Sequence, residues 1–310
     1  MTNDSELNNS KASEIDLREI AMVLWDSRLK ILSVTLVFVV CSALYAISLP
    51  NQYRATVLLA PAQQDSGGLS GMLGQLGGLA SLAGVNISGG ESSELQVAIQ
   101  TMRSWSFIDE FIVTNGLAVD IYATKGWSRS SDKLIIDEDY YNSKEKTWLV
   151  EDRESGKIGA PSSWKLFKAF DERLAISEDS DSGLVRISID FYSPQIAKKW
   201  VDLFVSAINS HMQKRKVERV SMNIEFLENQ INKTSIAEMQ GVFYTIIEEQ
   251  IKAKMLAEAG PDYAFVTVSP SMIPEQKIGP KRVMICIVGM LSGVMLSILL
   301  ILVKQSYREP

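Results

Sequence analysis

The sequence contains little cysteine and almost no histidine, and both shortages narrow the classes of protein it can encode. Its 310 residues include two cysteines, Cys41 and Cys286, and one histidine, His211. Because both cysteines lie inside apolar runs, the hydrophilic bulk of the chain offers neither a disulfide framework nor a metal–thiolate site. A cysteine-free middle fits an extracytoplasmic compartment without proving one. One histidine cannot make a histidine-rich zinc site, so we expect His211 to be an exposed or packing residue.

Signals of nucleotide or nucleic-acid binding are also missing. Residues 67–90 hold nine glycines but no lysine, and no GxxxxGK[ST] pattern occurs anywhere in the chain. The net charge of −6 argues against nucleic acid as a main partner. We therefore expect a protein that is not an enzyme, with no catalytic residues, no metal ligands and no cofactor.

Two long uncharged runs are the strongest positive signal. Ile31–Leu49 and Val283–Val303 contain 19 and 21 residues without a charge. At about 1.5 Å of rise per residue, each can cross a hydrocarbon core of about 30 Å as a helix. The alternatives are a buried core helix for either run and a cleaved signal peptide for the first. The long, acid-containing lead-in and the poor cleavage site favour an uncleaved anchor.

Two spans place both termini on the same side of the membrane. Basic residues are usually enriched on the cytoplasmic side of a span. Five basic residues flank the two spans on the side of the termini and four on the opposite side, so the count only slightly favours cytoplasmic termini. The terminal set is Arg18, Arg28, Lys30, Lys304 and Arg308, and the opposite set is Arg54, Lys277, Lys281 and Arg282. We expect the termini in the cytoplasm and the large intervening segment outside.

The first part of that segment combines strand and helix patterns. Alternation over Gln52–Pro61 and Gly183–Tyr192 predicts strands, and the second pairs plausibly with the "ERLAIS" segment at 172–177. Apolar spacing over Glu91–Gly116 predicts one helix ending at Asn115-Gly116. The polar stretch from about Tyr122 to Lys165 gives no clear pattern. An α+β fold follows.

A very long helix is predicted next. Ser193 is a suitable N-cap and Pro194 a suitable first helical residue, while Gly260-Pro261 stops the run. An uninterrupted helix would be about 65 residues and on the order of 100 Å long. Two alternatives are a fold-back near Gly241 and a break around 232–235. Four apolar residues of this helix follow 4-3-4 spacing and form a seam along one side. A helix this long cannot bury such a seam within a small domain and needs neighbouring helices, which predicts a homo-oligomer. The seam residues are Val220, Ile224, Leu227 and Ile231.

Four segments together resemble the polysaccharide co-polymerase family, the Wzz-type chain-length determinants of bacterial surface polysaccharides. They are "EIDLREIAMVLWDSRLKIL", "YRATVLLAP", "DFYSPQIAKKWVDLFVSAIN" and "YAFVTVSPSMIPEQKIGPKR". The last holds Pro270, Pro274 and Pro280 at the family's proline positions, but departs from its motif at Ser269, Ser271 and Lys277. Since proline fixes φ and removes a donor, we interpret this segment as a stiff connector; an ordinary linker is the alternative.

The resemblance implies a non-catalytic, homo-oligomeric scaffold of the bacterial inner membrane. It would set the chain length of an O-antigen-like polysaccharide, as in lipopolysaccharide biosynthesis, through a Wzy-type polymerase. Its partners would be the lipid bilayer, that polymerase and the growing lipid-linked glycan. An export component or transport adaptor of the same architecture, or a membrane-anchored sensor, are alternatives. The expected organisation is a cytoplasmic segment (1–30), first span (31–49), periplasmic α/β base (50–192), helical protrusion (193–260), return strand and connector (261–282), second span (283–303) and cytoplasmic tail (304–310).

Three further groups of residues are candidate contact sites. Gly289 and Gly293 form a GxxxG pair that predicts close helix packing in lipid. A basic cluster on the long helix is either a solvated face or a contact to an oligomer lumen or anionic glycan, and it contains Lys214, Arg215, Lys216 and Arg219. The glycine-rich tract is either a linker or a mobile apolar flap whose contact residues would be Leu69, Met72, Leu73, Leu76, Leu79 and Leu82.

Overall fold

The computed structural model describes Trp25 and residues 27–62, 90–151 and 158–306, which divide into two compact units. One unit contains the two apolar helices, and the other contains residues from Asn51 to Ile278.

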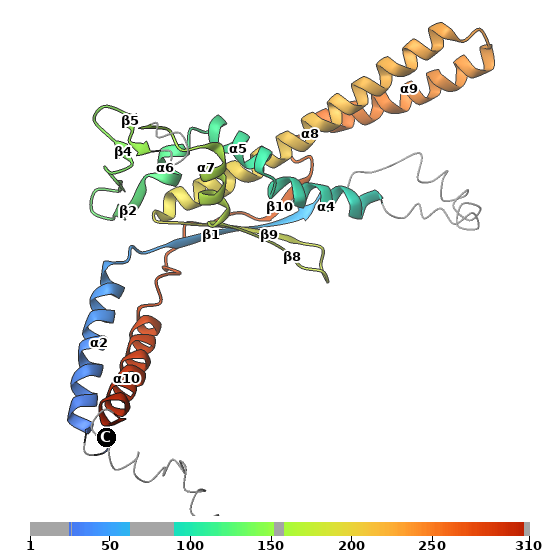
Figure 1. Cartoon of the computed structure of the whole chain (residues 1–310). Coiled ribbons are helices and arrows are strands. Elements are labelled where there is room, and N and C mark those ends of the chain that lie inside the picture. The colour runs from blue at the N-terminus through green and yellow to red at the C-terminus, as the bar shows by residue number, and fades with distance from the viewer. Residues whose placement is uncertain (1–24, 26, 63–89, 152–157, 307–310) are drawn as a thin grey trace, which may run out of the picture. The chain divides into compact units, whose positions relative to one another are not determined.

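The first unit is a pair of antiparallel apolar helices, α2 (Arg28–Ser48) and α10 (Arg282–Ser306), which lie side by side (Figure 1). Both are long and apolar enough to cross a membrane. Only 6% and 11% of their most apolar windows are buried by protein. A core helix of a soluble domain would be mostly covered, so this exposure favours spans over buried helices.

The second unit is built on a four-stranded antiparallel sheet in the order β10-β1-β9-β8. These strands are β10 (Phe265–Ser269), β1 (Tyr53–Pro61), β9 (Val185–Phe191) and β8 (Leu174–Glu178). Alternation in the sequence predicts β1, β8 and β9, and the structure confirms all three. In β1, Ala55, Val57 and Leu59 are buried, because alternate side chains of a strand point to the same face.

The β8–β9 turn is closed by a local hydrogen-bond network. The Asp179 carboxylate accepts from the Ser182 hydroxyl at 2.9 Å and from the Asp181 backbone N–H at 3.1 Å. Bonds to the charged form, that from Ser182 first, lower the pKa of Asp179. Gly183 supplies the positive φ of 67° that this turn requires.

Several short elements lie between β1 and the sheet's later strands. The helices are α4 (Gly90–Met102), α5 (Trp105–Thr114), α6 (Ala118–Tyr122) and α7 (Ser163–Asp171). Three small hairpins occupy the stretch without a clear sequence pattern: β2 (Thr124–Ser128) with β3 (Lys133–Ile136), β4 (Tyr141–Asn142) with β5 (Thr147–Trp148), and β6 (Val150–Glu151) with β7 (Ile158–Gly159).

The single helix predicted over 91–116 is wrong, because the structure divides it into α4 and α5. The chain leaves the helical path at Arg103 and Ser104. The Ser104 hydroxyl then accepts from the Phe107 backbone N–H and caps a new helix. The cap at Ser104 therefore ends one helix and starts another, although the helical spacing of apolar residues continues through the break.

The helix predicted to run unbroken from 193 to 260 is also wrong. It forms a hairpin of α8 (Pro194–Lys233) and α9 (Ala237–Glu258), which pack side by side (Figure 1). The reversal occurs at 234–236, which confirms the second alternative, a break around 232–235, while Gly241 lies inside α9. The Gln240 amide donates to the Thr234 carbonyl at 2.7 Å and stabilises the reversal.

A distance measurement separates the hairpin from a continuous helix. Spin labels at Met222 and Glu248, both exposed, lie 26 positions apart, which in one helix corresponds to about 39 Å. We expect a much shorter distance, of the order of two packed helix diameters or about 20 Å. Electron–electron double resonance on labelled protein diluted with unlabelled protein measures it. A dominant distance near the longer value would contradict the hairpin.

Candidate functional site

The base of α8 is anchored in the sheet domain by aromatic packing. Ser193 caps the helix by accepting from the Ile196 backbone N–H, and Pro194 occupies its first turn. Trp200 and Phe204 are fully buried, and Phe204 contacts the Phe107 ring edge-on with centroids 5.4 Å apart. Because these side chains are held in the core, the orientation of α8 about its own axis is fixed. Through Phe204, this anchored side of the helix contacts α5, which carries Phe107.

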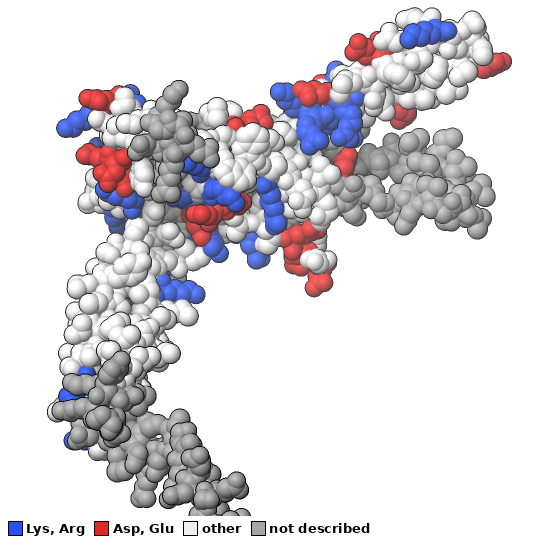
Figure 2. All heavy atoms as spheres, viewed as in Figure 1, with Lys and Arg blue, Asp and Glu red and all other residues white. Residues whose placement is uncertain are grey.

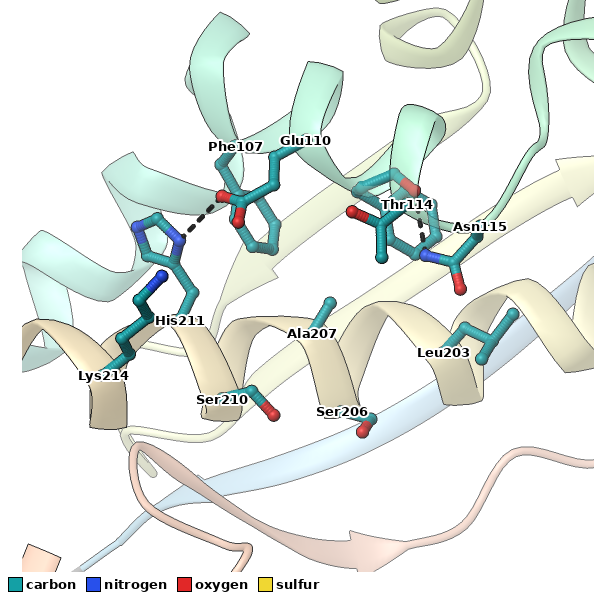
Figure 3. Close-up of a pocket in the computed structure, with 11 residues that line it drawn as sticks. Phe107, Glu110, Thr114, Asn115, Leu203, Ser206, Ala207, Ser210, His211 and Lys214 are labelled. Atoms are coloured by element: carbon teal, nitrogen blue, oxygen red, sulfur yellow. Dashed lines mark hydrogen bonds and ion pairs between the residues drawn. The ribbon is translucent and has the colours of Figure 1, made fainter.

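Between α5 and α8 lies a hollow of about 290 Å³, which Figure 3 shows in close-up. It combines aromatic rings with hydroxyl, amide and charged groups. Its lining residues are Phe107, Glu110, Phe111, Thr114, Asn115, Leu203, Ser206, Ala207, Ser210, His211 and Lys214. Polar and apolar surfaces in one hollow are typical of sites for small organic molecules.

His211 closes one end of this hollow through contacts to α5. Its Nδ1 lies 3.2 Å from a carboxylate oxygen of Glu110, and its ring meets the Phe107 ring edge-on at 5.3 Å (Figure 3). The histidine is thus a half-buried packing residue with a polar partner. That geometry agrees with the packing role expected for His211.

Two further hollows follow along α8 beyond His211. One, of about 520 Å³, is lined by His211 and Arg215 and by polar residues of α4 and the start of α5, including Gln96, Gln100 and Thr101. The next, of about 120 Å³, shares Arg215 and also contacts Lys216, Arg219 and Tyr263. Neighbouring hollows share a lining residue, and the three together are called here the α8 groove, but the contact of His211 with Glu110 separates the first hollow from the second.

The basic cluster predicted from the sequence spans the three hollows: Lys214 lines the first, Arg215 the second and third, and Lys216 and Arg219 the third. Figure 2 shows a patch of Lys and Arg atoms over the middle of α8. The Lys216 ammonium pairs with Glu94 of α4 at 3.4 Å. Across the described part of the chain, no carboxylate lies within ion-pair distance of Lys214, Arg215 or Arg219. Glu218 is on the same helix but lines none of the three hollows.

The strand that returns from the hairpin is tied to α8 by Asn209, which is buried. Its amide donates to the Phe265 carbonyl at 2.9 Å and accepts from the Ala264 and Phe265 backbone N–H groups at 3.0 and 2.8 Å. Farther along, the Ser271 hydroxyl bonds to Asp202 of α8. These contacts hold β10 against the helix that carries the groove.

The proline-containing segment after β10 is neither helix nor strand from Pro270 to Ile278, and it bends at Gln276. The Ile278 backbone N–H donates to the Gln52 carbonyl at 2.8 Å, and the Lys277 ammonium to the Asn51 amide oxygen at 3.4 Å. Pro280 follows in the other unit, after a cis Gly279–Pro280 bond. That this segment is a stiff connector stays a prediction.

In the helix pair, the two glycines of α10 face α2. A Cβ added to Gly289 would lie 2.5 Å from the Ser42 side chain, and one added to Gly293 would lie 2.8 Å from that of Phe38. Real Cβ atoms do not approach so closely, so these glycines permit the close approach of the two helices.

The predicted oligomer seam is partly used inside the chain. Val220 and Ile231 are buried, and Ile224 and Leu227 are half-buried, with α9 packed along α8. The folded-back helix supplies a neighbour that the sequence-based argument sought in another subunit. The candidate flap residues 69–82 lie outside the described residues.

The sequence predicted the basic cluster of the α8 groove but missed its opposite wall. Glu110 lies on α5 and Asn115 directly follows it, about a hundred positions before their neighbours on α8. No local pattern connects such distant segments. Both predicted helices carry polar residues, but most surface helices do, so this feature does not identify a shared site.

Together, the structure defines a mixed α/β domain with a helical hairpin in a chain that also carries two apolar helices able to span a membrane. Residues 13–114 match a family model, Wzz, described as "Chain length determinant protein". This match confirms the resemblance to Wzz-type polysaccharide co-polymerases over the first third of the chain.

Two other comparisons add solved structures and a negative result. A "full-length bacterial polysaccharide co-polymerase" is similar over 94% of this chain and 98% of its own, with a TM-score of 0.43 and 11% identity. A "Fragment of WzzB, Polysaccharide Co-polymerase from Salmonella Typhimurium" is similar over 74% of this chain and 100% of its own, with a TM-score of 0.29 and 11% identity. No curated protein matches the sequence.

Proposed function

We propose that this protein is a non-catalytic scaffold that sets the chain length of a bacterial surface polysaccharide. The observation that carries the proposal is the match of residues 13–114 to the chain length determinant model. Two apolar helices and a large domain between them suit a protein that acts beside a membrane-bound polymerase. The polymer would be O-antigen-like, and its polymerase of the Wzy type.

The same proposal places the chain in the inner membrane with both termini in the cytoplasm. The α2 and α10 pair would then span the bilayer, and the sheet domain with its hairpin would lie in the periplasm. The absence of cysteine from residues 50–282 suits that oxidising compartment. The counts of flanking basic residues favour this orientation only slightly.

A homo-oligomer is the proposed working form, and the hairpin supports it. Even with α8 and α9 packed together, several large apolar side chains remain exposed. They include Met222, Phe226, Met239, Val242, Tyr244 and Leu256. Exposed apolar surface on this scale marks contact surfaces, and a second hairpin is the proposed occupant. Native mass spectrometry in mild detergent measures the subunit number, and a monomer would contradict this part of the proposal.

The function is tested by deleting the gene and separating the cell's surface polysaccharide by gel electrophoresis. We expect polymer to persist while its preferred length is lost, since a regulator is missing and the polymerase is not. Loss of all surface polymer would instead indicate an export component. An unchanged length distribution would contradict the proposal.

A further inference from the structure

We propose that the hairpin of β2 and β3 is a contact surface for anionic lipid headgroups. The inference goes beyond chain-length control and rests only on the part of the proposed function that inserts α2 and α10 in a bilayer. Three observations carry it: short chain connections join its contact residue to both apolar helices, its tip carries unpaired positive charge, and its outer face combines basic and apolar side chains.

The two chain segments that lead to the apolar helices leave the sheet domain at one place. The Ile278 backbone N–H donates to the Gln52 carbonyl at 2.8 Å, next to Tyr53, the first residue of β1. Tyr53 lies five positions after Ser48, where α2 ends, and Ile278 lies four positions before Arg282, where α10 begins. Since one residue spans at most about 3.6 Å, these connections reach at most about 18 and 14 Å.

This limit follows from chain length alone, and it applies to any bilayer that the two helices span. The headgroup layer on each side of such a bilayer is about 5–7 Å thick. The end of the sheet domain that carries Tyr53 is therefore tethered within a short reach of lipid headgroups.

The β2–β3 hairpin contacts Tyr53 through Trp127, which lies two positions before the hairpin tip at 129–132. The two rings meet edge-on with centroids 6.0 Å apart. The Trp127 indole N–H also donates to the Asp132 carboxylate at 2.9 Å, which ties the tip to the strand that carries Trp127. The tip is thus held at the end of the domain from which both connections leave.

Positive charge at this tip is unpaired. Arg129 and Lys133 are exposed, and no carboxylate among the described residues lies within ion-pair distance of either. The acid of the tip, Asp132, accepts the bond from the indole, and the exposed Glu138 and Asp139 follow the opposite end of β3. Lipid phosphates would supply anionic partners, because phosphate accepts charge-assisted hydrogen bonds from guanidinium and ammonium groups.

The outer face of the hairpin suits the boundary between water and lipid. Because side chains alternate along a strand, Lys133 and Ile135 share the face opposite Leu134, which packs against the core of the domain. Ile135 is 44% exposed. At a bilayer surface the basic side chain binds phosphate while the apolar one enters the acyl boundary. A dissolved phosphate would meet the charges but not Ile135, which favours lipid over a soluble anion.

Contact is measured on the full-length protein in nanodiscs that contain phosphatidylglycerol and a phosphatidylcholine with a nitroxide on its headgroup. Cys41 and Cys286 are replaced by serine, and a fluorophore is attached at S131C in the hairpin tip. The nitroxide quenches fluorophores close to the headgroups. We expect stronger quenching at Ser131 than at the matched control Ser235, which is exposed beyond the 40 residues, or about 60 Å, of α8.

Charge variants and neutral lipid test the headgroup contact itself. R129Q together with K133Q is expected to lower the quenching at Ser131 to the level at Ser235, since losing two basic side chains weakens attraction to an anionic surface by about thirtyfold. K144Q together with K146Q removes the same charge from the exposed β4–β5 turn and is expected to change nothing. Nanodiscs without phosphatidylglycerol are expected to give the same loss as the first double variant.

The fluorophore at L44C, a residue exposed on α2, reports insertion of the helices. Melting temperatures equal to that of the parent show that each variant is folded. Quenching at Leu44 with none above the control at Ser131, equal quenching at Ser131 in neutral and anionic nanodiscs, or an equal loss in the K144Q and K146Q variant would overturn the lipid contact. No quenching at Leu44 would overturn insertion and the contact together. The gel test of chain length is independent of these results, so failure of the contact and failure of the proposed function are distinguishable.

Discussion

The N209L variant is expected to lower the free energy of unfolding by about 3–5 kcal/mol, since leucine has a similar size but no polar atoms. Asn209 is buried and bonds to three backbone groups of Ala264 and Phe265. Leucine would leave those groups without partners, and each buried unsatisfied group costs about 1–3 kcal/mol. Chemical unfolding of the full-length protein in detergent, followed by tryptophan fluorescence, measures the change.

The neighbouring Ser210 provides the control for that measurement. It is exposed on the same helix, and S210A is expected to change stability by about 0.5 kcal/mol or less. A loss below about 1 kcal/mol in N209L would contradict the role of Asn209 in tying β10 to α8. A large loss would show that the strand leaving the hairpin is held by the helix that enters it.

The G289L variant is expected to separate α2 from α10. The added side chain would overlap Ser42, and overpacking of a close interface costs about 1–3 kcal/mol. Spin labels at Leu32 and Leu300, which are exposed near the same end of the pair, report the separation in a background with both cysteines replaced by serine. We expect one short distance in the parent and a longer, broader distribution in G289L.

The face of α10 that is exposed and turned away from α2 supplies the matched control. V288L adds bulk at a residue that is exposed beside Gly289, so the distance is expected to stay unchanged. Dilution with unlabelled protein restricts the measurement to labels within one chain. An unchanged distance in G289L would show that the two glycines are not required for the close approach of α2 and α10.

The parts of this fold that the sequence predicts are those specified by local pattern. Alternation fixes which residues of β1 and β9 are buried, and the Ser193-Pro194 pair marks the start of α8. Each signal needs only a few neighbouring residues. The two long apolar runs are equally local, because a span depends on length and composition alone.

The parts that the sequence misses depend on contacts between distant segments. From 231 to 237 the chain can continue as a helix or reverse, and the packing of α9 against α8 favours reversal. Likewise, the hydrogen bond between Glu110 and His211 joins residues 101 positions apart. The basic cluster could therefore be predicted from sequence, but the α8 groove that contains it could not.

The length distribution of the surface polysaccharide tests the central claim most directly. It is measured in a deletion strain, in the same strain re-expressing the wild-type chain, and in one re-expressing N209L. A preferred length that disappears on deletion and returns only with the wild-type chain is the predicted result. A preferred length that persists without the protein would contradict the claim that this chain controls polysaccharide length.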